Sequence, residues 1–413
     1  MPDAFACFLR NDGEVLLCRR GDDPETGDGP TAESAEWDVP RAPAGDDPEA
    51  VATALAERAA GDATLVRSGR AVDAGGESVR PFLFDCADRS VDSAALPGDP
   101  AETAWATPTE LLRRDAGPGA WRAYEVVAPT VRSVAADDEH GSAYLSVRAL
   151  EVLRDRAAVV ADEGAADDAE LRDLAARLRR ARPSMAALHN RVNRAVAEAD
   201  GTPAGVEASA DGGIDRAIRA DEGAASAAAD RVRGEHALTL SRSGTVLAAL
   251  REGPPAALFV AESRPGNEGV GVAETLADGT SVTLHTDAAA AHVLATADVD
   301  AVLVGADTVL PDGSVVNKTG TRAVALAAAR EGVPLYAAAA SDKVATDEEV
   351  PLESGDRAAV YDGDAPVDVR NPTFDVTPPD LVEAVVTERG ALSPDDVADV
   401  AEELRELAER ADE

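Results

Sequence analysis

The side chains with the clearest potential for chemistry lie in residues 298–330. A short apolar run at 301–304, typical of a strand buried on both faces, ends in a Gly-Ala-Asp sequence whose carboxylate is Asp307. Asn317 and Lys318 follow a turn sequence and precede an alanine-rich helical segment that begins Thr-Gly-Thr. Glycine and threonine at a helix start leave backbone N–H groups available to an anion. We therefore predict that Asp307, Asn317 and Lys318 converge on one anion-binding pocket.

The use of lysine strengthens this prediction. Lys318 and Lys343 are the only lysines in the chain, although arginine is common. An ammonium is a compact point charge suited to phosphate, and the planar fork of arginine is not equivalent to it. The plain alternatives are that Lys318 is a solvated surface charge and that Asp307 caps a turn. The scarcity of lysine favours a phosphate or sugar-phosphate role for Lys318.

The surrounding pattern predicts a Rossmann-like α/β domain with a parallel sheet over residues 235–405. Short apolar runs alternate with helical segments, as in a doubly wound sheet with right-handed crossovers. Strands are expected at 237–240, 257–261, 282–285, 301–304, 335–339 and Val360, and helices at 244–251, 269–276, 288–295 and 321–331. Ligands of such sheets bind outside the carboxyl ends of the strands. The further polar residues expected in this crevice are Ser241, Ser243, Arg264 and Lys343.

Residues 130–233 predict a helical subdomain. They lack strand signals and carry leucine and valine at helical spacing, which is the pattern of an ordinary core. A helix start is expected at 182–184, and a loop or hinge at 202–213. Gly141 precedes a helix, so its backbone amide is a candidate anion ligand, whereas the neighbouring His140 is more typical of an ordinary loop residue.

Residues 1–128 predict a separate α+β module. Apolar runs at 4–9 and 14–18 flank an Asn-Asp-Gly sequence, which is a strong hairpin signal. A helix is expected at 48–60 and a strand at 80–86. Trp-x-x-Pro sequences follow the hairpin and the second strand region, so the order of elements is distinctive.

Composition restricts the class of function. The formal net charge is −39 and the acidic residues are spread along all 413 positions, which is typical of a protein of a high-salt cytosol. An acidic surface for a basic partner is the alternative. Direct binding of nucleic acid is not expected. The crevice also lacks a Gly-x-Gly-x-x-Gly or Gly-Lys-Ser/Thr loop, which argues against a dinucleotide or a nucleoside triphosphate bound in the standard manner.

The three cysteines and the absence of long apolar runs restrict the class of function further. The cysteines are odd in number and show no Cys-x-x-Cys spacing, so neither a disulfide framework nor a zinc site is indicated. No segment reads as a signal peptide or is long enough to span a bilayer. We expect a soluble cytoplasmic protein with no membrane partner and no metal ion or other cofactor in the crevice.

The order of elements in residues 1–128 resembles a Nudix domain. In that family a helix carries glutamates that hold divalent metal, in a run of the form Arg-Glu-x-x-Glu-Glu-x-Gly. Aligned on Gly61, the metal glutamates fall on Leu55, Arg58 and Ala59, and Glu57 is the one acidic residue of that run. Magnesium does not accept such ligands. The resemblance therefore implies a degenerate, non-catalytic Nudix-like module, with magnesium bound only if the module is active.

Six ordered motifs over about residues 130–405 resemble a second family. They are Arg-Pro-Ser at 182–184, Ser-Gly-Thr-Val-Leu at 243–247, Glu-Ser-Arg-Pro at 262–265, Val-Gly-Ala-Asp at 304–307, Asn-Lys-Thr-Gly-Thr at 317–321 and Asn-Pro-Thr-Phe-Asp-Val-Thr-Pro-Pro at 371–379. Together they look like the superfamily of the alpha, beta and delta subunits of translation initiation factor 2B. The superfamily also holds isomerases of methylthioribose 1-phosphate and ribose 1,5-bisphosphate. The resemblance implies dimers or higher homo-oligomers.

This chain departs from the isomerases at two positions. The cysteine that follows the first strand in those enzymes aligns with Ser241, while their aspartate is kept as Asp307. A serine hydroxyl is far less acidic than a thiol and needs an activating base. The arginine of their Arg-Gly pair is His140, which removes a permanent charge. Both departures argue against isomerase chemistry, although the pocket still suits a ligand.

Three functions follow from these patterns. The favoured one is a regulatory, non-catalytic protein that binds a sugar phosphate or nucleotide monophosphate, possesses a fused Nudix-like module and has an initiation factor as a possible partner. Its ligand-binding residues would be Arg264, Asn317, Lys318, Gly141, Ser243 and Lys343. The second is an aldose–ketose isomerase of a ribose 1-phosphate type substrate, with Asp307 and Ser241 as catalytic residues. The third is a Nudix hydrolase of a nucleoside diphosphate derivative.

Overall fold

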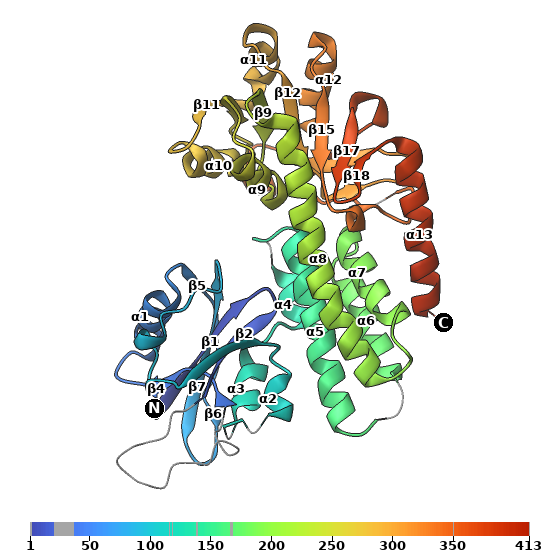
Figure 1. Ribbon diagram of the computed structural model, residues 1–413. Helices are drawn as coiled ribbons and strands as arrows, with labels where there is room; N and C mark the ends of the chain where they lie inside the picture. The colour runs from blue at the N-terminus through green and yellow to red at the C-terminus, as the bar shows by residue number, and fades with distance from the viewer. Residues whose placement is uncertain are drawn as a thin grey trace. The chain divides into compact units, whose positions relative to one another are not determined.

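The computed structural model describes residues 2–19, 37–114, 116–117, 119–137, 139–165, 168–349 and 351–412 (Figure 1). The chain forms two compact units. The first comprises Met1–Thr130, Glu151–Leu171 and Asp200–Ile214, and the second comprises Val131–Leu150, Arg172–Ala199 and Asp215–Glu413. Three long helices therefore contribute residues to both units.

The first unit is built on a mixed eight-stranded sheet. Its strands run in the order β3-β2-β1-β7-β5, with β4 paired to β1, β6 to β7 and β8 to β2. The strands are β1 (Ala4–Asn11), β2 (Glu14–Arg19), β3 (Trp37–Asp38), β4 (Arg41–Pro43), β5 (Ala63–Ser68), β6 (Val72–Asp73), β7 (Ser78–Cys86) and β8 (Glu102–Ala106). The helices that accompany them are α1 (Pro48–Ala60), η1 (Ser93–Ala95), α2 (Glu110–Arg113) and α3 (Ala120–Val127).

Local sequence explains two features of this unit. Asp12 and Gly13 both have positive φ, 49° and 81°, so they form the two-residue turn predicted between β1 and β2. Alternate side chains of the sheet point to opposite faces, and one face packs against α1 while the other packs against α3. The unit is thus a three-layer arrangement of helix, sheet and helix.

The second unit is built on a seven-stranded sheet in the order β11-β10-β9-β12-β15-β17-β18, beside a small antiparallel sheet β13-β14-β16. The strands are β9 (His236–Leu240), β10 (Ala257–Ala261), β11 (Ser281–His285), β12 (Ala301–Gly305), β13 (Thr308–Val309), β14 (Val315–Lys318), β15 (Leu335–Ala338), β16 (Phe374–Thr377), β17 (Ala384–Thr387) and β18 (Gly390–Leu392). Only β18 is antiparallel in the large sheet.

Helices cover both faces of the large sheet, as the alternating pattern predicts. One face packs against α8 (Pro203–Val232), α9 (Gly244–Glu252) and α10 (Glu268–Leu276). The other packs against α11 (Ala290–Thr296), α12 (Thr321–Glu331) and α13 (Pro394–Asp412). The remaining elements are α4 (Val131–Ala136), α5 (Ser142–Asp162), α6 (Ala169–Ala181), α7 (Ala186–Ala197), η2 (Asp287–Ala289), η3 (Ser341–Lys343), η4 (Arg357–Ala359) and η5 (Pro379–Leu381). The predicted α/β fold with a parallel sheet is confirmed for this unit.

Three predicted elements differ from the structure. The expected hinge at 202–213 is the first part of α8, because Thr202 accepts a hydrogen bond from the N–H of Gly205 (3.0 Å) and Pro203 suits the first helical turn. The helix start expected at 182–184 comes later, at Ala186. Val360 is 55 % exposed and follows the 3-10 turn η4, so it is not a strand. The sheet continues instead through β17, which the sequence analysis does not predict.

Candidate functional site

The carboxyl ends of β9 and β12 form the switch point of the large sheet. These two strands are parallel neighbours, and the chain proceeds from β9 to β10 on one side and from β12 to β15 on the other. Ser241 and Ser243 follow β9, and Asp307 follows β12. Crevices at such points are the common ligand sites of open α/β sheets. The sequence therefore places its candidate residues at the expected edge.

Gly305 allows two of these strand ends to approach closely. A Cβ atom on Gly305 would lie 2.6 Å from Oγ of Ser243 and 3.9 Å from Oδ1 of Asn317. Ser243 caps the start of α9, where its hydroxyl accepts a hydrogen bond from the N–H of Val246 (3.4 Å). Asn317 is buried, and its amide donates to the Thr321 hydroxyl (3.0 Å). Ser243 and Asn317 therefore both lie beside Gly305.

Asp307 lies within electrostatic range of both lysines of the chain. Its backbone N–H donates to the Val316 carbonyl (2.9 Å), which anchors it to β14. Lys343 is only 5 % exposed, and its ammonium donates to the Ala306 carbonyl (2.7 Å). Burial raises the pKa of Asp307, while the charges of Lys343 and Lys318 lower it. Both ammonium groups therefore favour the ionised form of this buried carboxyl.

A second carboxylate, which no sequence pattern indicates, lies in the same pocket as Asp307. Glu353 lines the same small pocket as Asp307, and its negative charge further raises the pKa of Asp307. The Ser184 hydroxyl donates to Oε1 of Glu353 (2.6 Å). The pocket has a volume of about 20 Å³, room for roughly one water molecule, and Phe374 lines its wall. A sugar that reached both carboxylates would have to displace part of this wall.

Lys318 is held by a carboxylate of its own chain. Its ammonium lies 2.5 Å from Oε1 of Glu268, at the start of α10. The side chain of Lys318 is 25 % exposed, and its ammonium is paired with this carboxylate. A phosphate that binds Lys318 must therefore compete with Glu268.

Three backbone anion sites at this edge are also filled by carboxylates. Asp375 accepts from the N–H groups of Gly320 (2.8 Å) and Arg322 (3.2 Å) at the start of α12. The amides predicted to bind an external anion thus bind Asp375, and that part of the prediction is wrong. Asp287 similarly accepts from the N–H groups of Ser263 (2.8 Å) and Arg264 (2.7 Å). Glu388 accepts from the N–H of Ser341 (2.9 Å).

The remaining candidates lie at the margin. Ser241 has φ of 61°, and its N–H donates to the hydroxyl of Ser263 (2.6 Å). The Arg264 side chain is 65 % exposed, and its Nε lies 3.4 Å from Glu262. Gly141 is exposed just before α5. Within the described residues, Arg264 and Gly141 make no hydrogen bond to the group around Asp307.

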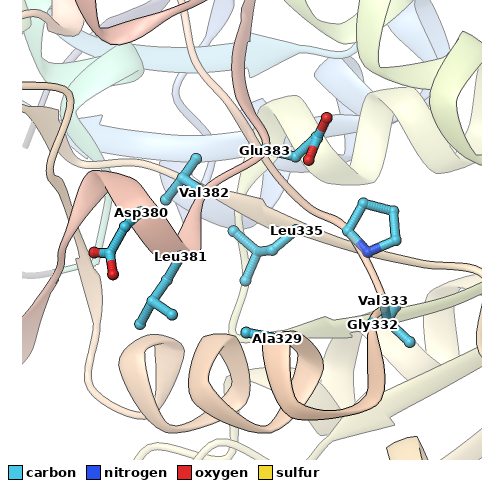
Figure 2. A pocket seen from close by; sticks show the side chains of 9 residues that line it. Ala329, Gly332, Val333, Leu335, Asp380, Leu381, Val382 and Glu383 are labelled. Atoms are coloured by element: carbon cyan, nitrogen blue, oxygen red, sulfur yellow. The ribbon is translucent and has the colours of Figure 1, made fainter.

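A larger hollow, about 270 Å³ in volume, lies at the opposite edge of the sheet (Figure 2). It is lined by the end of α12 and by the residues that lead into β15 and β17. Figure 2 shows the carboxylates of Asp380 and Glu383 directed away from one another, with apolar side chains between them. Without converging polar groups, this hollow is a weaker candidate than the crevice.

The first unit shows no metal site in the described residues. Leu55 and Ala59, which stand where the Nudix resemblance requires glutamates, are 2 % exposed and pack against the sheet. These residues do not fit a magnesium ion. Residues 20–36 lie outside the described part of the chain. In that described part, no helix is long and apolar enough to cross a membrane.

The fold and its crevice define a doubly wound α/β protein with a carboxylate and two lysines at the switch point. The chain belongs to the Initiation factor 2 subunit family, whose sequence profile matches residues 138–394. The family resemblance predicted for about residues 130–405 is therefore confirmed. The Nudix-like assignment of residues 1–128 stays a prediction.

The similar proteins are named either as sugar-phosphate isomerases or as translation initiation factors. A ribose 1,5-bisphosphate isomerase of Haloferax volcanii is 36 % identical over 303 residues, which are 67 % of this chain and 93 % of the relative. A methylthioribose-1-phosphate isomerase of Nostoc punctiforme is 39 % identical over 163 residues, 37 % of this chain and 46 % of the relative. Among solved structures, the translation initiation factor eIF-2B of Pyrococcus horikoshii OT3 is 27 % identical with a TM-score of 0.54, and the match covers 64 % of this chain and 95 % of that one.

Proposed function

We propose that the crevice binds a sugar phosphate and isomerises it, an aldose of the ribose 1-phosphate type becoming a ketose. The observation that carries the proposal is Asp307, a carboxyl of raised pKa beside two ammonium groups and a second carboxylate. The sequence alone favoured binding without catalysis. The isomerase of Haloferax volcanii matches this chain over 93 % of its own length, and this similarity gives the catalytic alternative more weight.

The reaction requires two proton transfers. One proton passes from C2 to C1, and the other passes from the C2 hydroxyl to the ring oxygen as the bond between C1 and the ring oxygen breaks, so that C2 becomes the ketone carbon. Two carboxyl groups in one pocket can hold opposite protonation states, because the charge of one disfavours the ionisation of the other. We assign protonated Asp307 as the group that donates a proton to the ring oxygen, and Glu353 as the base that removes the proton from C2 and returns it to C1.

The other residues of the crevice would bind rather than react. Lys318 and Lys343 would hold phosphate, with the exposed guanidinium of Arg264 as a third cation. Ser241 would donate a hydrogen bond to a sugar hydroxyl, because a serine needs an activating base to act as a nucleophile and no histidine neighbours Ser241 in the sequence. The stretch around Glu353 and Phe374 would move to admit the sugar, since the present pocket is too small.

Direct assay tests the proposal. The full chain in molar salt should convert ribose 1,5-bisphosphate or methylthioribose 1-phosphate into the corresponding ketose phosphate, seen by ¹³C NMR as a new carbonyl carbon. Exchange of the C2 hydrogen with deuterated solvent should accompany turnover if a carboxylate carries the proton. Binding of both compounds without any ketose formation would contradict the catalytic proposal.

A regulatory binder is the second candidate, and two observations favour it. Ser241 replaces the thiol of the isomerases, and Glu268 neutralises Lys318. This reading expects a sugar phosphate or nucleoside monophosphate to stabilise the protein without reacting. A ligand at about 100 times its Kd adds about 2.7 kcal/mol to the free energy of unfolding, which thermal-shift measurements detect.

Glu268 provides a test of phosphate binding that is independent of catalysis. Glu268→Gln should raise the affinity for a sugar phosphate by about tenfold, because one competing charge near Lys318 is removed. Isothermal titration calorimetry measures the change. Glu274→Gln on the same helix is the matched control, since Glu274 is exposed. Equal affinities for Glu268→Gln and the unchanged protein would place the phosphate away from Lys318.

We also propose roles for the rest of the chain. The first unit would be a Nudix-like module without hydrolase activity, because Leu55 and Ala59 cannot hold magnesium. The chain would form a homo-oligomer and could engage an initiation factor. Mass photometry reports the oligomer, and magnesium-dependent phosphate release from nucleoside diphosphate derivatives by the full chain would contradict the module's assignment.

A further inference from the structure

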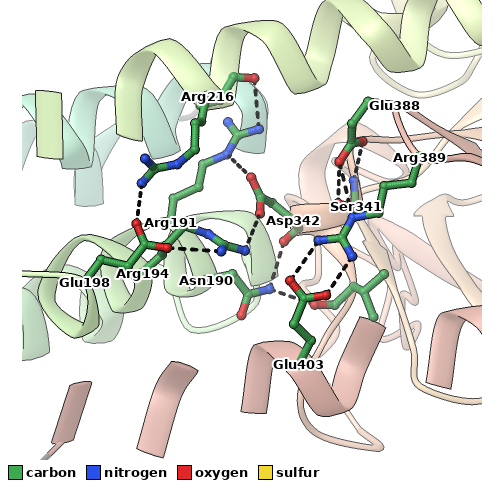
Figure 3. Close-up of polar contacts among 12 residues, drawn as sticks. Asn190, Arg191, Arg194, Glu198, Arg216, Ser341, Asp342, Glu388, Arg389 and Glu403 are labelled. Carbon is green, nitrogen blue, oxygen red and sulfur yellow. Dashed lines mark hydrogen bonds and ion pairs between the residues drawn. The ribbon is translucent and has the colours of Figure 1, made fainter. Parts of the chain in front are cut away.

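Two side chains of α7, Asn190 and Arg191, hold the segment that contains Lys343, and we call these two residues the clamp. The Asn190 amide donates both of its hydrogens, one to the carbonyl of Asp342 (2.8 Å) and one to that of Val344 (2.7 Å). The residues before and after Lys343 are thus tied to one side chain (Figure 3). On the other side, the Ser341 hydroxyl donates to Glu388.

Arg191, the next residue of α7, completes the clamp. Its guanidinium is buried and its Nε donates to Oδ2 of Asp342 (3.1 Å). Its Nη1 donates to the Ser146 hydroxyl of α5 (2.8 Å), and its Nη2 contacts the Asp221 carboxylate of α8 (3.2 Å). Two weaker contacts with the carbonyls of residues 143 and 217 give partners to all five N–H groups. One side chain therefore ties three helices to η3.

The charge of Arg191 is stable in this setting. Burial alone lowers the pKa of Arg191, but the carboxylates of Asp221 and Asp342 raise it above its usual value. A lysine in its place could not make five bonds in a fixed plane. A permanent, fully satisfied cation is suited to holding a loop in one position.

We propose that Asn190 and Arg191 are positioning residues that hold Lys343 against the Ala306 carbonyl, beside Asp307. The side chain of Lys343 is long and flexible, so its place depends on where residues 341–344 are fixed. Neither Asn190 nor Arg191 lines the pocket of Asp307 and Glu353. They act through Lys343. The catalytic meaning of this position rests on the proposed function, whereas the position itself does not.

Lysine acylation tests the clamp without a substrate. The chain has only two lysines, so mass spectrometry can follow the modification of Lys343 and Lys318 in the same molecules. Arg191→Met should speed the acylation of Lys343 by about tenfold, because a local opening of residues 341–344 becomes easier, and should leave Lys318 nearly unchanged. Asn190→Ala should act in the same direction. Arg191→Lys should fall between Arg191→Met and the unchanged protein, because it keeps the charge and loses the fork.

Arg216→Met is the matched control. Arg216 pairs with Glu198 (3.1 Å) close to the clamp and does not bond to η3, so both lysines should keep their rates (Figure 3). Faster acylation of Lys343 alone in Arg191→Met and in Asn190→Ala would support the proposal. Equal acceleration of both lysines would show a general loosening and overturn it, and so would unchanged rates. The acylation rates do not depend on isomerase activity. The proposed function can therefore fail without affecting this test of the clamp.

Discussion

Asp307→Asn should abolish ketose formation and leave the protein folded. General acid–base catalysis contributes about 10²–10⁴-fold to a rate, so kcat/KM should fall within that range or below detection. An amide has nearly the shape of a carboxyl group but cannot give a proton to the ring oxygen. The NMR assay that detects the ketose measures the effect, and calorimetry with the same sugar phosphate should show that binding persists.

The stability of Asp307→Asn provides its control. Burial raises the pKa of Asp307, so the ionised carboxylate costs folding free energy at neutral pH and the protonated form does not. Asp307 therefore destabilises the folded protein as the pH rises through its pKa in the folded state, and it does not do so at low pH. Asp307→Asn should therefore melt at a higher temperature than the unchanged protein at pH 7, with a difference that shrinks on acidification. A variant that is folded, stable and still active would remove Asp307 from the mechanism.

Sequence patterns were sufficient for most of the parallel sheet, because its strands are short apolar runs bounded by polar residues. β10 and α12 begin and end where the pattern places them. The same patterns place Asp307 at the end of β12, since the strand order makes carboxyl ends meet at one edge. The scarcity of lysine is a further signal, because it distinguishes Lys318 and Lys343 from the sequence alone.

The partners of these residues could not be predicted in the same way. Glu268, Glu353 and Asp375 lie on other elements, and no spacing rule joins them to Lys318, Asp307 or the start of α12. In a chain with 78 acidic residues, one more carboxylate carries little information. The amides at the start of α12 were correctly located but wrongly assumed to be free, because only tertiary structure brings Asp375 onto them.

The start of α8 shows a different limit. A stretch with glycine, proline and aspartate favours a loop by local preference. Here Thr202 and Pro203 supply a cap and a first turn, and buried residues such as Val206 and Ala210 add packing that outweighs the glycines. Tertiary packing decided the outcome.

Arg154→Met should destabilise the first unit by about 3–5 kcal/mol, because it leaves a buried carboxylate without its cation. Arg154 is 1 % exposed, and its guanidinium donates to Asp155 (2.9 and 3.0 Å) and to the Gly13 carbonyl (2.8 Å). In the variant, Asp155 would keep only the hydrogen bond from the Tyr124 hydroxyl (2.9 Å) among its described partners. Burial raises the pKa of Asp155, so the loss should be smaller at lower pH, where that carboxyl takes up a proton.

Tryptophan fluorescence isolates this effect, because all three tryptophans lie within the first 130 residues. Denaturant unfolding in molar salt, followed at the tryptophans, therefore reports the first unit. Arg156→Met is the matched control on the same helix: Arg156 is 38 % exposed, and its ion pair with Glu170 (2.6 Å) should contribute about 0–1 kcal/mol. A greater loss of stability in Arg154→Met than in Arg156→Met would then result from the burial of Arg154, and not from the loss of an arginine from α5. Equal unfolding midpoints for the two variants would show that Arg154 and Asp155 are not paired in a buried site.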